Sequence, residues 1–299
     1  MSEDRGFIDR TMPRQQKEWD IRGALNFIFG GAGAGLLFAC ALAVPFGADM
    51  RALEALGLLL VAAGLFCVWL KIGRPWRAFH VVRRPSTSWM SREAWLAPLV
   101  FLSGGLAIFS ASPLAIIAAG ATGLVYAYAQ GRILKANLGI PAWRRWSCVA
   151  LIVATALAEG VGLLCLAAPV WPSLAPMGYA LACLVAIRFW AWRAYRNDLR
   201  ATGAPSGSIK AFDAFEPRFV WIGHATAGVL ALAGAYAAQP LLLAIAGLLA
   251  AFGGALFKYV LVCRAAFTQG FSLPRTPSRG RSSPGPGLKP GWEKAGSVS

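Results

Sequence analysis

Apolar segments, each about as long as a membrane span, alternate with short polar segments along most of the chain. A helix that crosses a bilayer needs about 20 predominantly apolar residues, and Gly and Pro are compatible with such helices. Eight segments meet this requirement, near 25–47, 52–71, 94–111, 113–134, 147–168, 174–195, 219–238 and 240–263. The pattern predicts an all-α polytopic membrane protein with eight transmembrane helices.

The connecting segments have the same order of lengths in 25–134 and in 147–263, namely a very short loop, a loop of about twenty residues and a second very short loop. This order predicts two four-helix units related by a parallel repeat. The membrane domain is therefore expected over 25–263, after an N-terminal segment of residues 1–24. Ser, Pro and Gly are abundant in the 264–299 tail, which predicts disorder from about residue 275.

Charge predicts the orientation of the spans. The chain has 299 residues, of which 57% are apolar and 14% charged, and its formal net charge is +16. Of its 29 Lys and Arg residues, 28 lie on one side of the predicted spans and only Arg51 lies on the other. By the positive-inside rule, both termini and the basic face are expected in the cytoplasm, at the inner membrane of a bacterium. Charges at the ends of spans meet anionic lipid, so membrane lipid rather than nucleic acid is the expected partner.

The sequence argues against a metal or haem centre within this chain. Its six Cys residues occur singly, without the C-x-x-C spacing of an iron–sulfur or zinc site. Only His80 and His224 are available for haem, and His80 lies in a predicted loop. The glycines of 30–35 lack the third Gly of a dinucleotide-binding loop, and no strand precedes them. Gly31 and Gly35 are instead spaced for close helix packing.

Two groups within the predicted spans are candidates for proton transfer. Glu159 is the only acid well inside a predicted span, where carboxylates are costly and commonly functional. The alternative is a structural carboxyl paired with a neighbouring helix. His224 lies near the inner end of the seventh span, where it either handles protons or is a hydrogen-bonded packing residue.

Polar side chains are densest between the second and third predicted spans. Residues 71–79 and 85–93 combine cations, hydroxyls, tryptophans and one carboxylate. Ser91 is placed to cap the third span, and Glu93 lies in its predicted first turn. A binding site is one interpretation, and an interfacial loop with snorkelling cations and a Trp belt is the other.

The residues of this region resemble a known family. Gly73 to Phe79 and Thr87 to Glu93 are similar to the Gly-x-Pro-x-Arg-Ala-Phe and Thr-Ser-Trp-x-Ser-Arg-Glu stretches of membrane anchor subunits of the dimethyl sulfoxide reductase type, which are related to polysulfide reductase membrane subunits. Residues 139–143 and 264–274 look like the branch annotated with phenylacetyl-CoA acceptor oxidoreductases. Lys71 stands where the dimethyl sulfoxide reductases of this family carry a His.

The resemblance implies a membrane anchor that passes electrons between a four-cluster ferredoxin-like iron–sulfur subunit and membrane quinone, ubiquinone or menaquinone. A molybdopterin catalytic subunit would complete the oxidoreductase, and this chain would hold no haem, cluster or substrate chemistry of its own. On this hypothesis Lys71 and Arg74 polarise the quinone oxygens, and Glu93 exchanges a proton. Trp76 and Trp89 would shape the pocket. The expected docking residues are Arg77, Arg83, Arg84, Arg92, Arg144 and Arg145.

Two other hypotheses remain at this point. The eight spans, their repeated layout and Glu159 are also compatible with a secondary transporter. A purely structural tether would assemble with partners but show no response of quinone turnover to changes around Lys71 or Glu93.

Overall fold

The computed structural model describes residues 11–72, 80–273, 275 and 287–293. Eight helices in these residues are long and apolar enough to cross a membrane, as the hydropathy pattern predicts. Several spans consist of two to four consecutive helical segments. The elements are α2 (Ile21–Leu25), η1 (Asn26–Gly30), α3 (Gly31–Ala43), η2 (Val44–Phe46), α4 (Arg51–Lys71), α5 (Trp89–Ser110), α6 (Pro113–Ala136), α7 (Trp146–Cys165), η4 (Pro172–Leu174), α8 (Met177–Thr202), α9 (Ser206–Val220), η5 (Trp221–Thr226), α10 (Ala227–Tyr236), α11 (Pro240–Tyr259) and η6 (Val260–Arg264).

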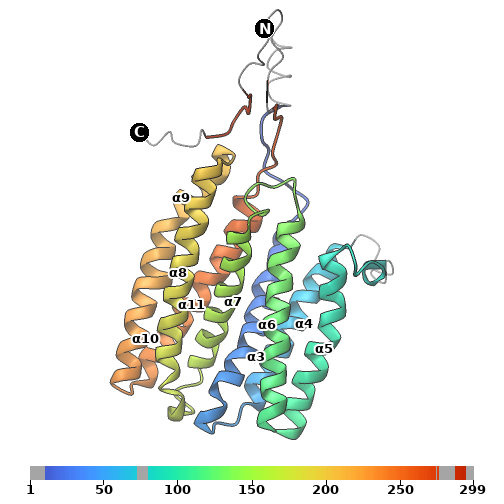
Figure 1. Cartoon of the computed structure of the whole chain (residues 1–299). Coiled ribbons are helices and arrows are strands. Elements are labelled where there is room, and N and C mark those ends of the chain that lie inside the picture. The colour runs from blue at the N-terminus through green and yellow to red at the C-terminus, as the bar shows by residue number, and fades with distance from the viewer. Residues whose placement is uncertain (1–10, 73–79, 274, 276–286, 294–299) are drawn as a thin grey trace, which may run out of the picture.

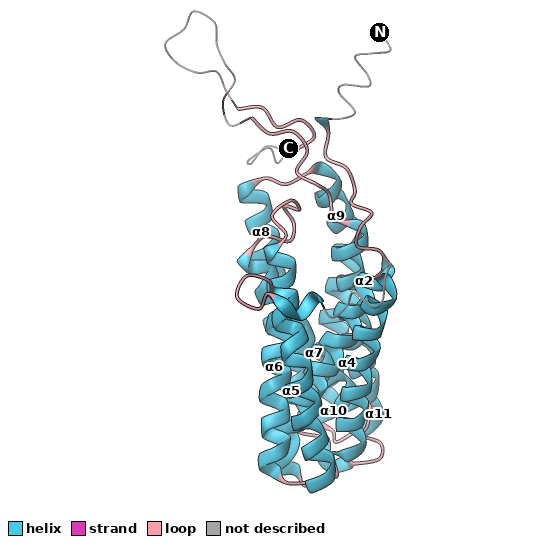
Figure 2. Cartoon of the chain, turned by 90° about the vertical axis from the view of Figure 1, so that its right-hand side faces the viewer, coloured by secondary structure: helices cyan, strands magenta, loops and turns pink. Residues whose placement is uncertain are grey.

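The helices run side by side, and the segments that precede the first and follow the last lie at the same end of the bundle (Figures 1 and 2). Residues 137–145 and 203–205 also connect helices at this end, which we call the basic end. At the opposite end the connections are short, as the sequence predicts, and include a proline at the first turn of both α6 and α11. A Pro fits the first helical turn because that position needs no backbone donor.

The two four-helix units have equivalent internal contacts. In the first unit α3 contacts α4, α4 contacts α5, α5 contacts α6 and α6 returns to α3. In the second unit α7, α8, α10 and α11 contact one another in the same cyclic order. The units meet mainly where α3 crosses α7, and Gly35 and Gly160 allow the two backbones to touch there. The spacing argument for close helix packing at Gly35 is thus confirmed, whereas Gly31 faces side chains of other helices.

Three spans differ in length from the hydropathy prediction. The third begins at Trp89 rather than near 94, because Ser88 and not Ser91 accepts the capping hydrogen bond, from the Ser91 backbone N–H at 3.4 Å. Glu93 therefore lies inside the helix and is buried. The sixth and seventh spans continue beyond the apolar segments as α8 and α9, which replace much of the predicted loop. Aromatic contacts of Trp192 with Phe212 and Phe215 hold this helical hairpin together.

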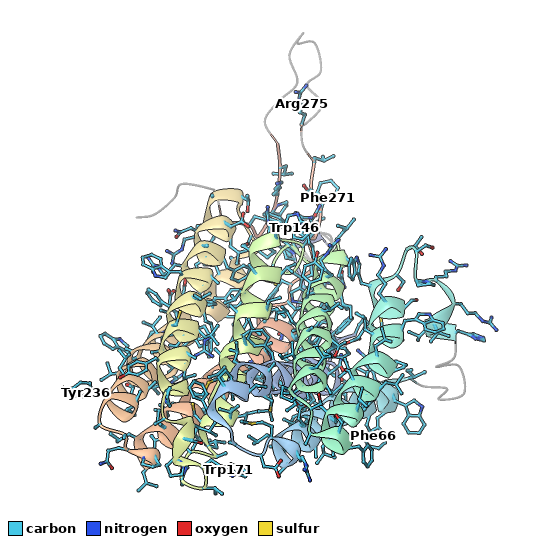
Figure 3. All side chains as sticks on the ribbon, turned by 60° about the horizontal axis from the view of Figure 1, so that its bottom comes forward. Phe66, Trp146, Trp171, Tyr236, Phe271 and Arg275 are labelled. Carbon is cyan, nitrogen blue, oxygen red and sulfur yellow. The ribbon has the colours of Figure 1, made fainter. Side chains whose placement is uncertain are left out.

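Large apolar side chains cover the outside of the bundle. Phe109 is 90% exposed and Tyr236 is 88% exposed, and many Leu and Ile residues on the spans face outward as well. Figure 3 shows Phe66 and Tyr236 projecting from the flanks of the bundle. A surface of this kind is stable in lipid and costly in water, so the chain is a multi-pass membrane protein.

The predicted disorder of the tail does not hold for residues 287–293. Leu288 exchanges two backbone hydrogen bonds with Leu273, and the Trp292 indole donates to the Gln269 carbonyl at 2.9 Å. The Glu293 N–H donates to the Ala204 carbonyl at 3.2 Å. These hydrogen bonds hold residues 287–293 at the basic end, although the surrounding sequence is rich in Ser, Pro and Gly.

The contact between the units predicts the effect of a single methyl group. A Cβ at Gly160 would overlap the backbone of Gly35 and Leu36, whereas a Cβ at Gly105 would meet nothing within 4 Å. We expect Gly160→Ala to lower the free energy of unfolding by about 1–3 kcal/mol through overpacking, and Gly105→Ala to leave it unchanged or slightly raised. Thermal unfolding in detergent measures both. Equal midpoints for the two variants would contradict the proposed close contact.

Candidate functional site

A cavity of about 310 Å³ opens near the basic end of the first unit. It lies between the start of the first span and helices α4, α5 and α6. Its walls are mostly apolar, with an amide, an ammonium and a carboxyl group among them. The lining residues are Trp19, Gly23, Asn26, Val68, Lys71, Ile72, Met90, Glu93 and Ile133. An apolar pocket with a few polar groups is typical of a small-molecule site.

Glu93 is the acidic group of this cavity, and only 7% of its surface is exposed. Its Oε1 accepts a hydrogen bond of 3.4 Å from Asn26 Nδ2 and another of 3.4 Å from Gln130 Nε2. The Gln130 Nε2 also donates to the Asn26 carbonyl at 3.0 Å. These contacts tie the first, third and fourth spans together around one carboxyl group.

Asn26 reaches Glu93 from an unusual piece of backbone. It is the first residue of η1, a π-helical segment between α2 and α3. A π-helical turn carries one extra residue and shifts the side chains that follow it, and such turns are frequent at functional sites. Gly64 of α4 has no side chain, so α4 can lie close to the Asn26 carbonyl and the Gly30 amide. This leaves room for the π-helical turn against α4.

The mouth of the cavity is formed by the segment before the first span and by the end of α4. Lys71 Nζ lies 5.3 Å from the centroid of the Trp19 ring, within the range of a cation–π contact. The Gln16 side chain holds the backbone of Trp19 on both its N–H and its carbonyl. Trp19 and Lys71 thus share one rim of the cavity.

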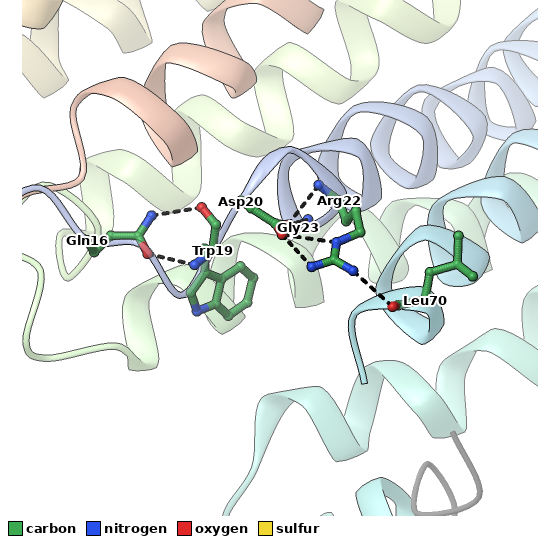
Figure 4. Close-up of polar contacts among 6 residues, drawn as sticks. All are labelled: Gln16, Trp19, Asp20, Arg22, Gly23 and Leu70. Carbon is green, nitrogen blue, oxygen red and sulfur yellow. Dashed lines mark hydrogen bonds and ion pairs between the residues drawn. The ribbon is translucent and has the colours of Figure 1, made fainter. Parts of the chain in front are cut away.

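Arg22 connects this rim to α4. Its Nη1 donates to the Leu70 carbonyl at 3.1 Å, while Nε and Nη2 donate to Asp20 Oδ2 at 3.0 and 2.7 Å (Figure 4). Asp20 also caps the first helix through the Arg22 and Gly23 backbone N–H groups. The guanidinium of Arg22 holds the pKa of Asp20 below its ordinary value, so this carboxyl is ionised at neutral pH.

The structure brings some of the predicted quinone-site residues together. Lys71 and Glu93 line the same cavity. Trp89 does not line it: its ring lies 4.2 Å from the Arg132 guanidinium carbon and contacts Tyr128 edge-on. The earlier start of α5 presents Met90 to the cavity instead. Arg74 and Trp76 lie outside the described residues.

Of the predicted docking residues that the structure describes, some are exposed and the others contact groups of this chain. Arg83 and Arg84 are exposed, whereas Arg92 is half-buried and donates to the carbonyls of Pro85 and Ser86. Arg77 lies outside the described residues. Arg144 donates to Leu138 O and Gln269 Oε1, and Arg145 pairs with Asp198 at 3.9 Å. Burial, together with the neighbouring charge of Arg145, lowers the pKa of Arg144.

A second polar centre lies in the other four-helix unit. Glu159 on α7 forms an ion pair through Oε2 with Lys258 Nζ on α11, and both side chains are almost completely buried. Two interpretations of Glu159 were given, and the structure shows the second, in which its carboxyl is paired with a neighbouring helix. Lys258 belongs to the 28 cations expected outside the bilayer, and its burial inside the bundle corrects that placement.

His224 belongs to the same centre. Arg188, also counted among the 28 cations of the cytoplasmic side but completely buried in the bundle, donates from Nε to His224 Nε2 at 3.2 Å and from Nη1 to the Ala250 carbonyl at 2.8 Å. The His224 Nδ1 lies 2.7 Å from the Phe219 carbonyl and must carry the ring proton, because Nε2 accepts from Arg188. Both ring nitrogens therefore have partners, as expected for a hydrogen-bonded packing histidine. Glu159 and His224 lie in the second unit, apart from the cavity of Glu93.

Asn26, Gln130 and Glu54 are among the buried polar residues that the sequence analysis missed. Asn26 and Gln130 have neutral amide side chains, so a search for charged residues within apolar segments does not find them. Glu54 is completely buried in the first turn of α4, and neither of its carboxyl oxygens has a partner among the described residues. Glu54 follows Arg51 by one turn, at the start of the predicted second span, so the sequence did not distinguish it from an acidic residue of the preceding loop. Assigning the residues of 113–134 to the faces of a helix would have identified Gln130, since it lies among small residues on the buried face of α6.

No family model matches this chain, and no curated protein matches it. The resemblance to anchor subunits thus stays a prediction. The site is defined by its own geometry, which is an apolar cavity with Glu93 in its wall and Lys71 at its rim.

The buried ion pair predicts a non-additive response to substitution. Lys258→Met leaves Glu159 unpaired in the bundle, and Glu159→Leu leaves Lys258 unpaired. We expect either change to lower the free energy of unfolding by roughly 3–5 kcal/mol. The double variant Glu159→Leu/Lys258→Met should be more stable than either single variant, as measured by denaturant unfolding in detergent micelles. Additive losses in the double variant would show that the two side chains contribute independently.

Proposed function

We propose that this chain is the membrane anchor and quinone-interacting subunit of a multi-subunit molybdopterin iron–sulfur oxidoreductase. The observation that carries the proposal is the cavity of the first unit, with its apolar walls, one buried carboxyl and one ammonium at the rim. A quinone has an apolar ring and tail, and two oxygens that need hydrogen-bond donors and protons. The residue types of the cavity fit these requirements.

Each polar residue of the cavity has a distinct role in this proposal. Lys71 donates a hydrogen bond to a quinone oxygen from the rim, next to the ring of Trp19. Glu93 exchanges a proton with the bound molecule, because it is the carboxyl group that lines the cavity. Asn26 and Gln130 hold the carboxylate of Glu93 in position. Ubiquinone or menaquinone would be an exchangeable ligand that accepts or donates the electrons.

The partners follow from the charge of the basic end. A ferredoxin-like iron–sulfur subunit with an acidic surface would dock there and bring its terminal cluster close to the cavity mouth. Exposed Arg83 and Arg84 lie on the segment that leads into α5 and are the described cations best placed for docking. The catalytic molybdopterin subunit would bind beyond it. The positive-inside rule places this assembly on the cytoplasmic side of a bacterial inner membrane.

Filling the cavity tests the quinone site. Gly23 lines the cavity, whereas Gly228 faces open space with a single contact at 3.9 Å. We expect Gly23→Leu to reduce the amount of quinone that co-purifies with the chain at least tenfold, and Gly228→Leu to leave it unchanged. Extraction of bound quinone from detergent-purified protein provides the measurement. Full quinone content in a folded Gly23→Leu variant would place the ligand elsewhere.

Removing the carboxyl group tests the proton role. Glu93→Gln keeps the shape of the cavity, so quinone content should be retained. Quinone-coupled turnover of the purified complex should fall roughly 100-fold or more, as for loss of a general acid–base group. The same preparation should contain molybdenum and iron from co-purifying subunits. Full turnover in an assembled Glu93→Gln complex would remove the proton role, and a monomeric metal-free isolate would contradict the anchor.

A secondary transporter is the second candidate. The position of Glu159 on α7, the helix that contacts the first unit, favours it, since transporter sites lie at the interface of structural repeats. Solute uptake by the isolated chain in liposomes would support transport, whereas the anchor predicts no uptake. Glu159→Gln would be the variant that separates specific uptake from leakage.

A further inference from the structure

The two units have matching sets of polar side chains. In each unit every one of the four spans contributes one polar residue to a polar centre, which in the first unit includes Lys71 at the rim of the cavity. The residues of the first centre are Asn26, Lys71, Glu93 and Gln130, and those of the second are Glu159, Arg188, His224 and Lys258. Gln130 and Lys258 both come from the fourth span of their unit, each of which begins with a proline.

These two centres meet at Gly31. A Cβ at Gly31 would overlap Lys258 Nζ and would lie 3.1 Å from Gln130 Oε1. The missing side chain of Gly31 thus leaves the space in which the ammonium of the second unit approaches the amide of the first. Lys258 Nζ and Gln130 Oε1 are therefore close enough for a single water molecule to bridge them.

The amide of Gln130 has two different sides. Its Nε2 donates to Glu93 and to the Asn26 carbonyl, whereas its Oε1 is buried and has no hydrogen-bond partner among the described residues. An ammonium has three N–H donors, and Glu159 is the acceptor that the structure provides for Lys258. The Lys258 ammonium, which has donors to spare, therefore lies close to the Gln130 oxygen that has no partner among the described residues.

We infer that Lys258, held by Glu159, is a positioning residue for Glu93: it fixes the Gln130 amide with its N–H side toward the Glu93 carboxylate. When Glu93 is ionised, an amide flipped by 180° would turn its oxygen to the carboxylate and its N–H groups to an ammonium, so both contacts would become repulsive. The charge pair of the second unit thereby favours the ionised form of the pocket carboxyl in the first unit.

Other groups around Glu93 bear on its protonation and stay constant in the test. Tyr126 approaches it from α6, Asn26 from η1, and Lys71 shares its cavity from α4. On the side of Lys258, Arg188 adds a second buried cation. The consequence for quinone turnover rests on the proposed function, but the effect on Glu93 itself does not.

The test measures the protonation of Glu93 in the purified chain without quinone or partners. The carboxyl band of Glu93 is assigned by infrared difference spectroscopy against Glu93→Gln and titrated with pH. In Glu159→Leu/Lys258→Met, which removes both charges of the pair and leaves the net charge of the second centre unchanged, the titration midpoint should rise by about one pH unit, a tenfold change in the protonation equilibrium. The exposed-cation control Lys210→Met should not move it.

Gln130 provides the second arm of the experiment. Gln130→Leu should raise the midpoint of Glu93 as well, because one donor to the carboxylate is lost. Adding Glu159→Leu/Lys258→Met to Gln130→Leu should then cause no further rise, since the pair acts through the amide. An unchanged midpoint in the folded pair variant, or shifts that simply add in the combined variant, would overturn the inference. A failed quinone proposal with an intact shift would leave the inference standing.

Discussion

The close approach of α3 and α7 is the contact on which the rest of the structure depends. Without side chains at Gly35 and Gly160, the backbones of the two units touch, and the interface forms along small residues rather than bulky apolar ones. In a bilayer, helix association gains most from such contacts because lipid satisfies apolar surface equally well. One turn before Gly35 on the same helix, Gly31 continues the open face and admits Lys258 and Gln130 from the two fourth spans. A single stripe of small residues thus joins the units and brings their polar centres together.

Polar groups inside the bundle occur where several helices can satisfy them at once. Glu93 receives donors from two other helices, and Arg188 binds His224 and the Gly223 carbonyl on η5 and the Ala250 carbonyl on α11. Gly223 and Gly253 have no side chains next to Arg188, so its guanidinium can reach the backbone carbonyls at Gly223 and Ala250. Each such group would be costly alone, so the clusters also fix the rotation of their helices.

Hydropathy was sufficient for the number of spans, because apolar length is a property of each segment alone. The ends of α5, α8 and α9 were not predictable in this way, since capping by Ser88 and aromatic packing around Trp192 decide them. The sequence pattern drew attention to Lys71 and Glu93, and the structure shows that both line one cavity. Lys258 was misplaced because counting charges near span ends cannot show that a cation turns inward to Glu159. The π-helical turn at Asn26 has no signal in hydropathy either.

The two centres differ in how completely their own side chains occupy them, and this difference explains why one has a cavity. In the second unit oppositely charged long side chains reach one another, and His224 uses both ring nitrogens. In the first unit the ammonium of Lys71 turns to Trp19 at the rim, and Glu93 is held by amides from one side. That arrangement leaves a carboxyl in the wall of an apolar cavity, whereas the same fold elsewhere neutralises its carboxyl internally. Duplicated architecture can therefore provide one site for a ligand and one fixed charge pair that supports it.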